Sequence, residues 1–345
     1  MSLATPAFLA DYARLSEPRL RAFLDAKTAQ LNALPVDLGP AFAVLRDYLL
    51  RGGKRLRGAL VLLGHEAAGG AREDALDASM GVELLHAYLL IHDDFMDRDE
   101  VRRGGPTVHA ALAPSLGAHL GGSIAVLLGS LCEAWACELI LAAPVAPDRA
   151  LLAARQLTTA LQEVIVGQSL DLLAPQGPEL AAQGVLEVQR LKTGSYTFEL
   201  PLLLGALLAG AAPQMLAALT RYARPLGQAF QIADDLLGSF GSPAATGKTN
   251  ASDLREGKRT LLVARALEAA SPADAAALRA GLGNPQADVE ELREILRRTG
   301  AVDSASAQAA RLRDEALDAL EDSALPAQVA RTLREIADYT VGRTA

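Results

Sequence analysis

A nearly uncharged helical segment that ends in carboxylates limits the fold of this chain more than any other feature. Residues 81–91 are mostly apolar, and Asp93, Asp94 and Asp97 follow almost at once. Side chains four residues apart lie on one face of an α-helix, one turn apart, so Asp93 and Asp97 are expected to point the same way. An isolated DDxxD motif can equally be the solvated end of a surface helix. The apolar residues before it weigh against that reading, because they place the carboxylates at the end of a buried helix.

Carboxylates in this arrangement suit Mg²⁺, which usually takes one or two of them and completes its shell with water or phosphate oxygens. A second acidic pair, Asp234 and Asp235, ends the segment FQIADD later in the chain. Lysines and arginines lie close in sequence to both acidic sites. The two sites together predict the binding of a diphosphate with its metal ions.

The composition favours helices. Half of the 345 residues are hydrophobic but only 4% are aromatic, and Ala and Leu dominate. Strand-like alternation, internal repeats and linkers are not apparent, so one all-helical domain over residues 1–345 is the simplest prediction. A net charge of −8 argues against a nucleic-acid-binding protein, which would normally carry a basic face.

Two basic segments are candidates for binding phosphate. Lys54 and Arg57 follow two glycines at an expected helix start, where they can face the same way and bind an anion. A solvated basic turn is the alternative. Arg102 and Arg103 follow the first carboxylates, and they either bind a metal-bound phosphate or neutralise Asp99 and Glu100.

The middle of the chain holds further polar groups in apolar surroundings. Gln168 and Asp171 need partners inside an expected helix, and they either bond to each other or point into a polar cavity. Gly194, after Lys192 and Thr193, permits a break that exposes backbone carbonyls. The residues from Gly241 to Asn250 are expected to form a loop, and Lys248 and Lys258 flank the charged segment 253–257. This region is either a mobile surface loop or a lid that brings the two lysines over phosphates.

Membrane and export signals are weak. The N-terminus lacks the basic start and apolar core of a secretory signal. Residues 200–220 carry no charge, but prolines and glycines interrupt them, which favours buried helices over a membrane span. We therefore expect a cytoplasmic protein without a membrane span.

Taken together, these motifs resemble the all-trans isoprenyl diphosphate synthases of the polyprenyl synthetase family, and most of all the geranylgeranyl diphosphate synthases. The resemblance extends from Gly52 to about Leu262. It rests on nine motifs in the family's order: GKRLR at 53–57, His86, DDFMD at 93–97, RRG at 102–104, GQSLD at 167–171, KTG at 192–194, FQIADD at 230–235, GK at 247–248 and GK at 257–258.

The resemblance implies a bundle of long helices around a deep central cavity, usually in a homodimer. The enzymes of this family condense isopentenyl diphosphate with an allylic prenyl diphosphate by ionisation, condensation and elimination. By resemblance, three Mg²⁺ ions are bound, two by Asp93 and Asp97 and the third by Asp234. The allylic diphosphate would be bound by Arg102, Lys192, Lys248 and Lys258, and isopentenyl diphosphate by Lys54, Arg57, His86 and Arg103. Lys192, Thr193 and Gln231 would stabilise the allylic cation.

The sequence departs from the family pattern at two positions. The second acidic motif often ends in a third aspartate, and Gly238 stands there in this chain. The basic segment ends in Gly58, where the family usually has proline. We expect activity to survive the first change, because Asp234 is the predicted metal ligand.

The length of the product depends on Tyr88 and Leu89. In the family the growing tail passes along the first-motif helix, and these residues lie ~6–7.5 Å deeper than Asp93 at ~1.5 Å per residue. The bulky Tyr88 is a candidate floor for the tail, and a core role for it is also open. The first motif lacks the two-residue insertion of some family members, and with this one aromatic residue it most resembles the geranylgeranyl (C20) type; C15 and C25 or longer are the alternatives. Less favoured alternatives are a terpene cyclase, which would not need the isopentenyl site, and a non-catalytic partner subunit, which should have lost one acidic site.

Overall fold

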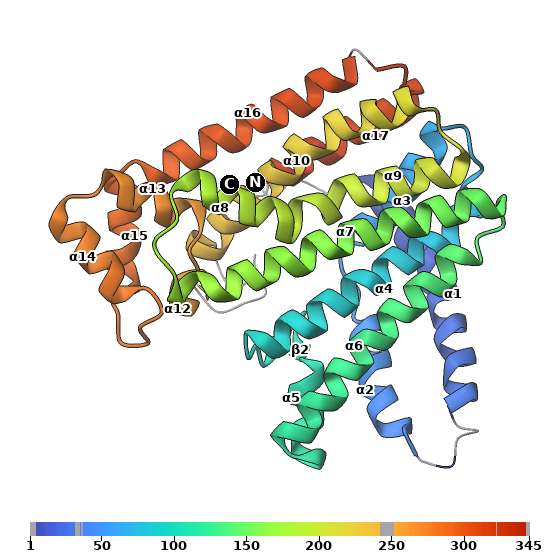
Figure 1. Ribbon diagram of the computed structural model, residues 1–345, viewed down its shortest axis with the longest axis horizontal. Coiled ribbons are helices and arrows are strands. Elements are labelled where there is room, and N and C mark those ends of the chain that lie inside the picture. The colour runs from blue at the N-terminus through green and yellow to red at the C-terminus, as the bar shows by residue number, and fades with distance from the viewer. Residues whose placement is uncertain (1–4, 32–34, 36, 242–251, 322, 343–345) are drawn as a thin grey trace. The chain divides into compact units, whose positions relative to one another are not determined.

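The computed structural model describes residues 5–31, 35, 37–241, 252–321 and 323–342, and these are almost entirely helical (Figure 1). The predicted all-α class is therefore confirmed. The chain falls into two compact units. The N-terminal unit holds Thr5–Arg155 and Leu204–Ala211, and the C-terminal unit holds Gln156–Leu203 and Ala212–Ala345. A single domain over residues 1–345 stays a prediction.

The N-terminal unit is built from six helices, a short hairpin and parts of two further helices. Its elements are α1 (Ala7–Leu31), α2 (Gly39–Leu50), α3 (Leu56–Ala67), α4 (Arg72–Met96), β1 (Val101–Arg102), β2 (Gly105–Pro106), α5 (Val108–Leu116), α6 (Ala118–Leu141), the start of α7 (Pro147–Leu173) and the end of α9 (Leu200–Ala209).

Helix α4 forms the core of this unit, between α3 and α6. Its first turn carries Glu73 and Asp74, whose charges favour a helix N-terminus. A Cβ atom at Gly81 would lie 2.9 Å from the carbonyl oxygen of Ala136, so glycine lets α4 and α6 approach closely. The helix then stays largely buried as far as the aspartates.

One small sheet was not expected. Val101 and Arg102 pair antiparallel with Pro106 and Gly105. Strands of two residues are too short to show alternating hydrophobicity, so they could not be predicted from the sequence. The hairpin fixes the position of the two arginines after the first acidic motif.

The C-terminal unit contains the rest of α7 and α9 and most of the remaining helices. These are the 3₁₀ turn η1 (Ala174–Gln176), α8 (Ala182–Gln189), the π-helix η2 (Arg190–Glu199), α10 (Pro213–Phe240), α12 (Ser252–Glu256), α13 (Leu261–Ala269), α14 (Pro272–Gly281), α15 (Val289–Arg298), α16 (Ala301–Glu321) and α17 (Ala327–Val341).

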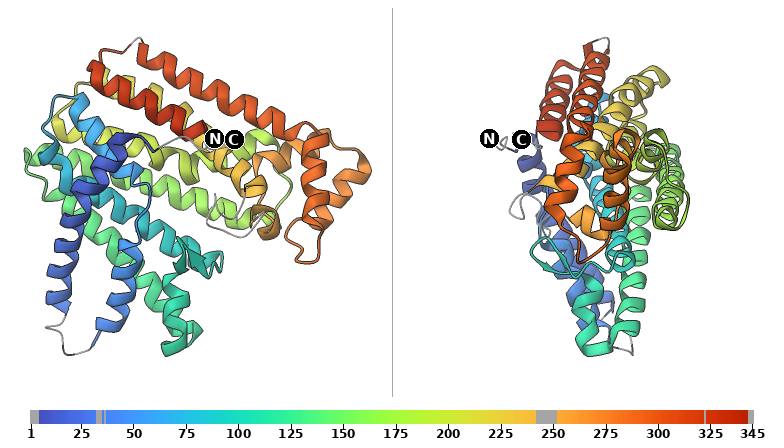
Figure 2. Two further views of the ribbon diagram at one scale, coloured as in Figure 1. Left: turned by 180° about the vertical axis from the view of Figure 1, so that it is seen from behind. Right: turned by 90° about the vertical axis from the view of Figure 1, so that its left-hand side faces the viewer.

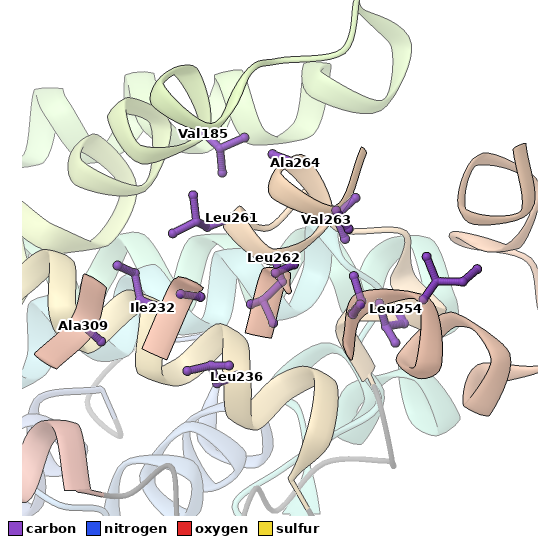
Figure 3. Close-up of a cluster of buried hydrophobic side chains, with 14 of the residues drawn as sticks. Val185, Ile232, Leu236, Leu254, Leu261, Leu262, Val263, Ala264 and Ala309 are labelled. Carbon is purple, nitrogen blue, oxygen red and sulfur yellow. The ribbon is translucent and has the colours of Figure 1, made fainter. Parts of the chain in front are cut away.

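Helix α10 is the centre of the C-terminal unit. It packs against η2 and α16, and α17 returns beside α16 (Figures 1 and 2). A buried apolar cluster joins α8, α10, α12, α13, α15 and α16, and Figure 3 labels Val185, Ile232, Leu254 and Leu261 among its members. This cluster fixes the end of α10 that carries the second acidic pair.

Two helices bear on the question of a membrane span. The uncharged stretch 200–220 is not one helix, because α9 ends at Ala209 and α10 begins at Pro213. Among the described helices, α6 alone is long and apolar enough to cross a bilayer, and 39% of its most apolar window is buried. Helix α6 packs against α4 and α5.

Candidate active site

The first acidic motif forms the C-terminal end of α4. The backbone N–H of Asp97 donates to the carbonyl oxygen of Asp93 over 2.8 Å, so the two residues lie one turn apart as predicted. Both are partly buried. Phe95 and Met96, between them, are exposed.

Asp94 holds a different position, in the interior. It is fully buried and accepts hydrogen bonds from the Tyr48 hydroxyl (2.9 Å) and from Nε of Arg102. Burial raises the pKa of Asp94 to about 6, although Arg102 and the two hydrogen bonds oppose the shift. Arg102 also donates to Asp99 over 3.1 Å and lies 3.9 Å from Asp93. Asp94 and Asp99 thus hold this arginine beside the first acidic motif.

The basic turn differs from the helical arrangement expected for Lys54 and Arg57. Arg55 has a φ of 48°, in the left-handed region, and α3 begins only at Leu56. Lys54 is therefore an exposed residue before the helix, whereas Arg57 is buried inside it. Lys54 and Arg57 therefore do not share the face of one continuous helix, as the prediction from their spacing assumed.

Arg57 and His86 lie together, on α3 and α4. Nη1 of Arg57 is 3.3 Å from Nε2 of His86. Burial, followed by the charge of Arg57, holds the pKa of His86 well below its usual range. A neutral ring can accept a hydrogen bond from the guanidinium N–H, so His86 orients Arg57.

Glu83 holds the basic turn, residues 51–58, in place. This buried carboxylate accepts a hydrogen bond from the backbone N–H of Gly58 (2.8 Å) and lies 3.6 Å from Nη1 of Arg55. A side chain at Gly58 would overlap the buried hydroxyl group of Tyr12. Glu83 was not predicted from the sequence, although an acidic residue within an apolar helical segment indicates that a hydrogen-bond or ionic partner lies beside it.

Arg103 folds back over the glycines of the basic turn. Its Nη1 donates to the carbonyl oxygen of Gly52 over 2.8 Å. With Arg55, Glu83 and His86 it lines a cavity of about 10 Å³, which is close to the volume that one water molecule needs.

Tyr88 lies deeper along α4. It is 9% exposed, and its ring packs edge-on against His92 with the centroids 4.6 Å apart. His92 is in turn fixed by α6, because its Nε2 lies 2.9 Å from the carbonyl oxygen of Val126 and a Cβ at Gly129 would come within 2.5 Å of its ring. His92 was not predicted from the sequence. It follows Tyr88 by four residues, and side chains at that spacing are neighbours on a helix surface. Leu89 is partly exposed.

The second acidic motif again pairs a partly buried aspartate with a buried one. Asp234 is partly exposed on α10, and Asp235 is 4% exposed. Nε2 of Gln189 donates to Asp235 over 2.5 Å and Nε2 of Gln231 over 2.9 Å. Burial raises the pKa of Asp235 to about 7, helped by the charge of Asp253 and opposed by the two amides. Gln189 was not foreseen from the sequence.

Lys192 contacts Asp171, one of the two polar residues of the segment 167–171 that were predicted to need partners. Its Nζ lies 2.6 Å from Oδ2 of Asp171. Gly167 makes this possible, because a Cβ there would lie 2.7 Å from the Cα of Lys192. Nε2 of Gln168 is buried and has no hydrogen-bond partner within the described part of the chain. Gln168 and Asp171 are therefore not a mutually bonded pair.

The remaining predicted residues have varied surroundings. Thr193 and Gly194 belong to the π-helix η2, and a Cβ at Gly227 would lie 2.7 Å from the carbonyl oxygen of Gly194. That carbonyl is covered by α10. Lys258 lies 2.7 Å from Oε2 of Glu256. Lys248 lies outside the described residues.

The donor sets fit Mg²⁺ that is bound together with a diphosphate. Within the residues that the structure describes, no group of three His, Cys, Asp or Glu side chains could hold a metal ion alone. Mg²⁺ needs only one or two carboxylates when phosphate oxygens and water complete its shell. Asp93 and Asp97, one helical turn apart, provide two, and Asp234 provides one.

Each unit thus collects part of the predicted site. The N-terminal unit holds Asp93, Asp97, Arg57, His86, Arg102 and Arg103. The C-terminal unit holds Asp234, Gln231, Lys192, Thr193 and Lys258.

Comparison with known proteins gives one consistent result. The family model described as polyprenyl synthetase matches residues 40–299. A short chain isoprenyl diphosphate synthase of Methanothermobacter thermautotrophicus is 35% identical over 85% of this chain and 87% of its own length. A (2E,6E)-farnesyl diphosphate synthase of Mycobacterium tuberculosis is 36% identical over 85% of this chain and 80% of its own. A crystal structure of geranylgeranyl pyrophosphate synthase from Corynebacterium glutamicum, complexed with isoprenyl diphosphate and magnesium, has a TM-score of 0.92 at 35% identity and covers 99% of this chain and 100% of that one.

Proposed function

The chain belongs to the polyprenyl synthetase family, and we propose that it condenses isopentenyl diphosphate with an allylic prenyl diphosphate to give geranylgeranyl diphosphate (C20). Membership confirms the predicted family and the predicted class of enzyme, a trans-prenyltransferase. The isoprenoid synthase fold that the resemblance implied agrees with the solved structures.

One observation carries the proposal beyond family membership. Asp93 and Asp97 end a buried helix one turn apart, and the neighbouring Asp94 fixes Arg102 beside them. Carboxylates that bind Mg²⁺ and a fixed guanidinium that binds phosphate oxygens are complementary to one diphosphate group. We propose that three Mg²⁺ ions bind with this group, two at Asp93 and Asp97 and one at Asp234.

The other cations divide between the two substrates. Mg²⁺ neutralises a diphosphate leaving group, so the allylic carbon–oxygen bond can ionise. We assign Lys192, Lys248 and Lys258, with Arg102, to the allylic diphosphate. Isopentenyl diphosphate is assigned to Lys54, Arg57, His86 and Arg103.

The hydrogen bond of Gln231 supports its assigned role at the allylic cation. Its amide N–H donates to Asp235, so the amide oxygen, the negative end of the dipole, is turned away from that carboxylate. An oriented dipole of this kind stabilises developing positive charge without reorganising. The Thr193 hydroxyl and the Lys192 carbonyl are assigned the same task.

Product length is proposed from Tyr88. The relatives named above include both farnesyl and geranylgeranyl synthases at nearly equal identity, so overall similarity does not choose the product. Tyr88 is buried and held by His92, which suits a fixed floor for the growing tail. Leu89, on the next position of α4, is assigned to the wall beside it.

A product assay tests the proposal. The purified chain is supplied with Mg²⁺, isopentenyl diphosphate and farnesyl diphosphate, and the prenyl alcohols released from the products are sized. A single C20 product is expected. Asp93→Ala should lower turnover on the order of 100-fold, because a loss of about 3 kcal/mol of transition-state stabilisation corresponds to that factor. Absence of product from every allylic starter would identify a non-catalytic partner subunit instead.

Replacement of Tyr88 tests the product length separately. Tyr88→Ala removes the aromatic floor, and we expect products of C25 and longer from the same assay. His92→Ala, which leaves Tyr88 in place but removes its lateral support, is the matched control and should give a mixture. A C20 product from Tyr88→Ala would place the floor elsewhere.

The proposal includes a cytoplasmic homodimer. In the N-terminal unit α6 exposes Leu120, Leu127 and Leu141, and the start of α7 exposes Leu151, each by half or more. Exposed leucines on neighbouring helices are typical of a surface that another chain covers. Sedimentation of the purified chain at micromolar concentration measures the assembly.

A further inference from the structure

Lys258, assigned above to the allylic diphosphate, lies on a short segment between two anchored residues. Leu254 before it and Leu261 after it are both buried in the apolar cluster of Figure 3. The N–H of Lys258 donates to the carbonyl oxygen of Asp253 over 2.9 Å, which holds its backbone against α12. The chain on the N-terminal side of Lys258 is therefore fixed by a main-chain contact.

Arg259 fixes the other side of Lys258 through its side chain. Its Nη1 donates to the carbonyl oxygens of Gly177 and Pro178 over 3.2 and 3.0 Å, and its Nη2 donates to that of Pro175 over 3.1 Å. These acceptors belong to the connection between α7 and α8. A planar guanidinium presents its donors in a fixed fork, so three carbonyl oxygens on one connection determine where Arg259 lies.

The connection that Arg259 holds belongs to the same part of the predicted site. Asp171 lies 2.6 Å from Nζ of Lys192, and it is on α7, two residues before that helix ends at Leu173. Arg259 therefore ties the segment of Lys258 to the chain that directly follows the partner of Lys192. Both lysines are assigned to the allylic diphosphate.

The side chains of Lys258 and Arg259 contact different segments. Nζ of Lys258 lies 2.7 Å from Oε2 of Glu256, whereas the guanidinium of Arg259 contacts the connection after α7. A substitution at Arg259 thus leaves the ammonium group of Lys258 in the chain and changes the support of its backbone.

We propose that Arg259 is a positioning residue, which holds Lys258 in place for the allylic diphosphate. Its three hydrogen bonds keep the backbone of Lys258 at a fixed distance from the connection after α7, so the ammonium group meets the phosphate oxygens in one geometry. This inference rests on the proposed function and adds to it a residue that acts through Lys258.

Steady-state kinetics, with farnesyl diphosphate and isopentenyl diphosphate varied in turn, test the inference. Arg259→Gln removes the fork and should raise KM for farnesyl diphosphate about 10-fold, because a misplacement of ~1 Å can cost up to about 100-fold. KM for isopentenyl diphosphate should change less than about 3-fold, since that substrate is assigned to other cations. Arg259→Lys keeps the charge without the planar fork and should behave like Arg259→Gln.

Combination with Lys258→Ala separates a positioning role from a purely structural one. Lys258→Ala alone should raise KM for farnesyl diphosphate about 10-fold or more, because a charge-assisted contact to phosphate is lost. Adding Arg259→Gln to Lys258→Ala should raise it less than about 2-fold further, whereas independent effects would multiply. Circular dichroism melts show whether each variant is folded, and Arg259→Lys replaces Arg259→Gln in this comparison if the glutamine variant does not fold.

Arg279→Gln is the matched control. Nε of Arg279, on α14, donates to Glu179 over 2.6 Å and so ties the same connection between α7 and α8 at a second point. The variant removes this exposed ion pair and leaves the segment of Lys258 unchanged, so both KM values should stay within about 2-fold of the unmodified chain. Equal effects of Arg279→Gln and Arg259→Gln would mean that the connection itself matters and would contradict the inference.

The possible failures are distinguishable. If Lys258→Ala raises KM for farnesyl diphosphate and Arg259→Gln does not, or if the two effects multiply, the inference is wrong and the proposed function stands. Unmodified kinetics in Arg259→Lys would also overturn the inference, because a single ammonium group would then suffice. If the unmodified chain makes no product, the proposed function fails and the inference fails with it; a Lys258→Ala variant without effect overturns the assignment of Lys258 and the inference together.

Discussion

Gly58 at the start of α3 and Gly238 near the end of α10 present the same feature in two different settings. At each, the space that a side chain would occupy is filled by a residue distant in sequence. Tyr12 fills the space at Gly58, and Asp253 fills it at Gly238. The two glycines differ in how freely the filling group can move.

Tyr12 is buried, and its hydroxyl is hydrogen-bonded. It is 1% exposed and its hydroxyl accepts a hydrogen bond from Ser79 over 3.1 Å. Not only the hydroxyl but also ring carbon Cε1, at 2.8 Å, would meet a Cβ atom at Gly58. Asp253, in contrast, is partly exposed and only its terminal carboxylate approaches Gly238. The first glycine therefore makes room for a buried ring, and the second makes room for a partly exposed carboxylate.

Gly58→Pro should have the largest effect of the changes that test this comparison. The ring would overlap Tyr12 at a cost of ~1–3 kcal/mol, and the buried Glu83 would lose the Gly58 N–H at a further ~1.5–3 kcal/mol. We expect the free energy of unfolding in urea to fall by about 4 kcal/mol. Gly58→Ala keeps the N–H and should lose only the first part. Equal losses for Pro and Ala would show that the hydrogen bond to Glu83 contributes nothing.

Glu83→Gln should have an intermediate effect. The amide oxygen can still accept from Gly58, but the charge beside Arg55 is lost, and we expect a destabilisation of about 2 kcal/mol. Because Glu83 positions the basic turn, KM for isopentenyl diphosphate should rise about 10-fold with kcat changed less than about 3-fold. Glu73→Gln, an exposed charge on the same helix, is the control. A fall in kcat with an unchanged KM would contradict the positioning role.

Gly238→Ala should change stability least. Alanine in a helix interior gains up to ~1 kcal/mol over glycine, and displacement of the Asp253 carboxylate offsets that gain. The net change in unfolding free energy is expected to stay below about 1 kcal/mol, measured by the same urea titration. A loss as large as that of Gly58→Ala would mean that Asp253 is held as rigidly as Tyr12, and the comparison would fail.

The sequence predicted what depends on local spacing. The helices Leu261–Ala269 and Val289–Arg298 each have an apolar face with 3.6-residue periodicity and a side-chain N-cap, both of which can be read from local sequence. Asp93 and Asp97 lie one turn apart for the same reason. Helix Pro272–Gly281 was missed.

What the sequence could not predict are contacts between distant segments. Periodicity tells which face of a helix is buried but not which residue covers it, so Tyr12 over Gly58 and Asp253 over Gly238 could not be foreseen. Gln189 on Asp235 is missed in the same way. Arg55, which separates Lys54 from α3, has a left-handed backbone conformation. Arginine seldom adopts this conformation, so the break could not be predicted from the sequence.

The π-helix η2 has a consequence for how this chain should be aligned with its relatives. A π turn accommodates one residue more than an α turn, so the segment Arg190–Glu199 is equivalent to an insertion that the helix absorbs without forming a loop. Deleting one residue would restore α geometry and rotate the two flanks by about 100° relative to each other. Lys192 would then no longer face Asp171 while the Gly194 carbonyl still faced Gly227. The number of residues in this segment, and not only their identity, therefore decides which groups face Asp171 and Gly227.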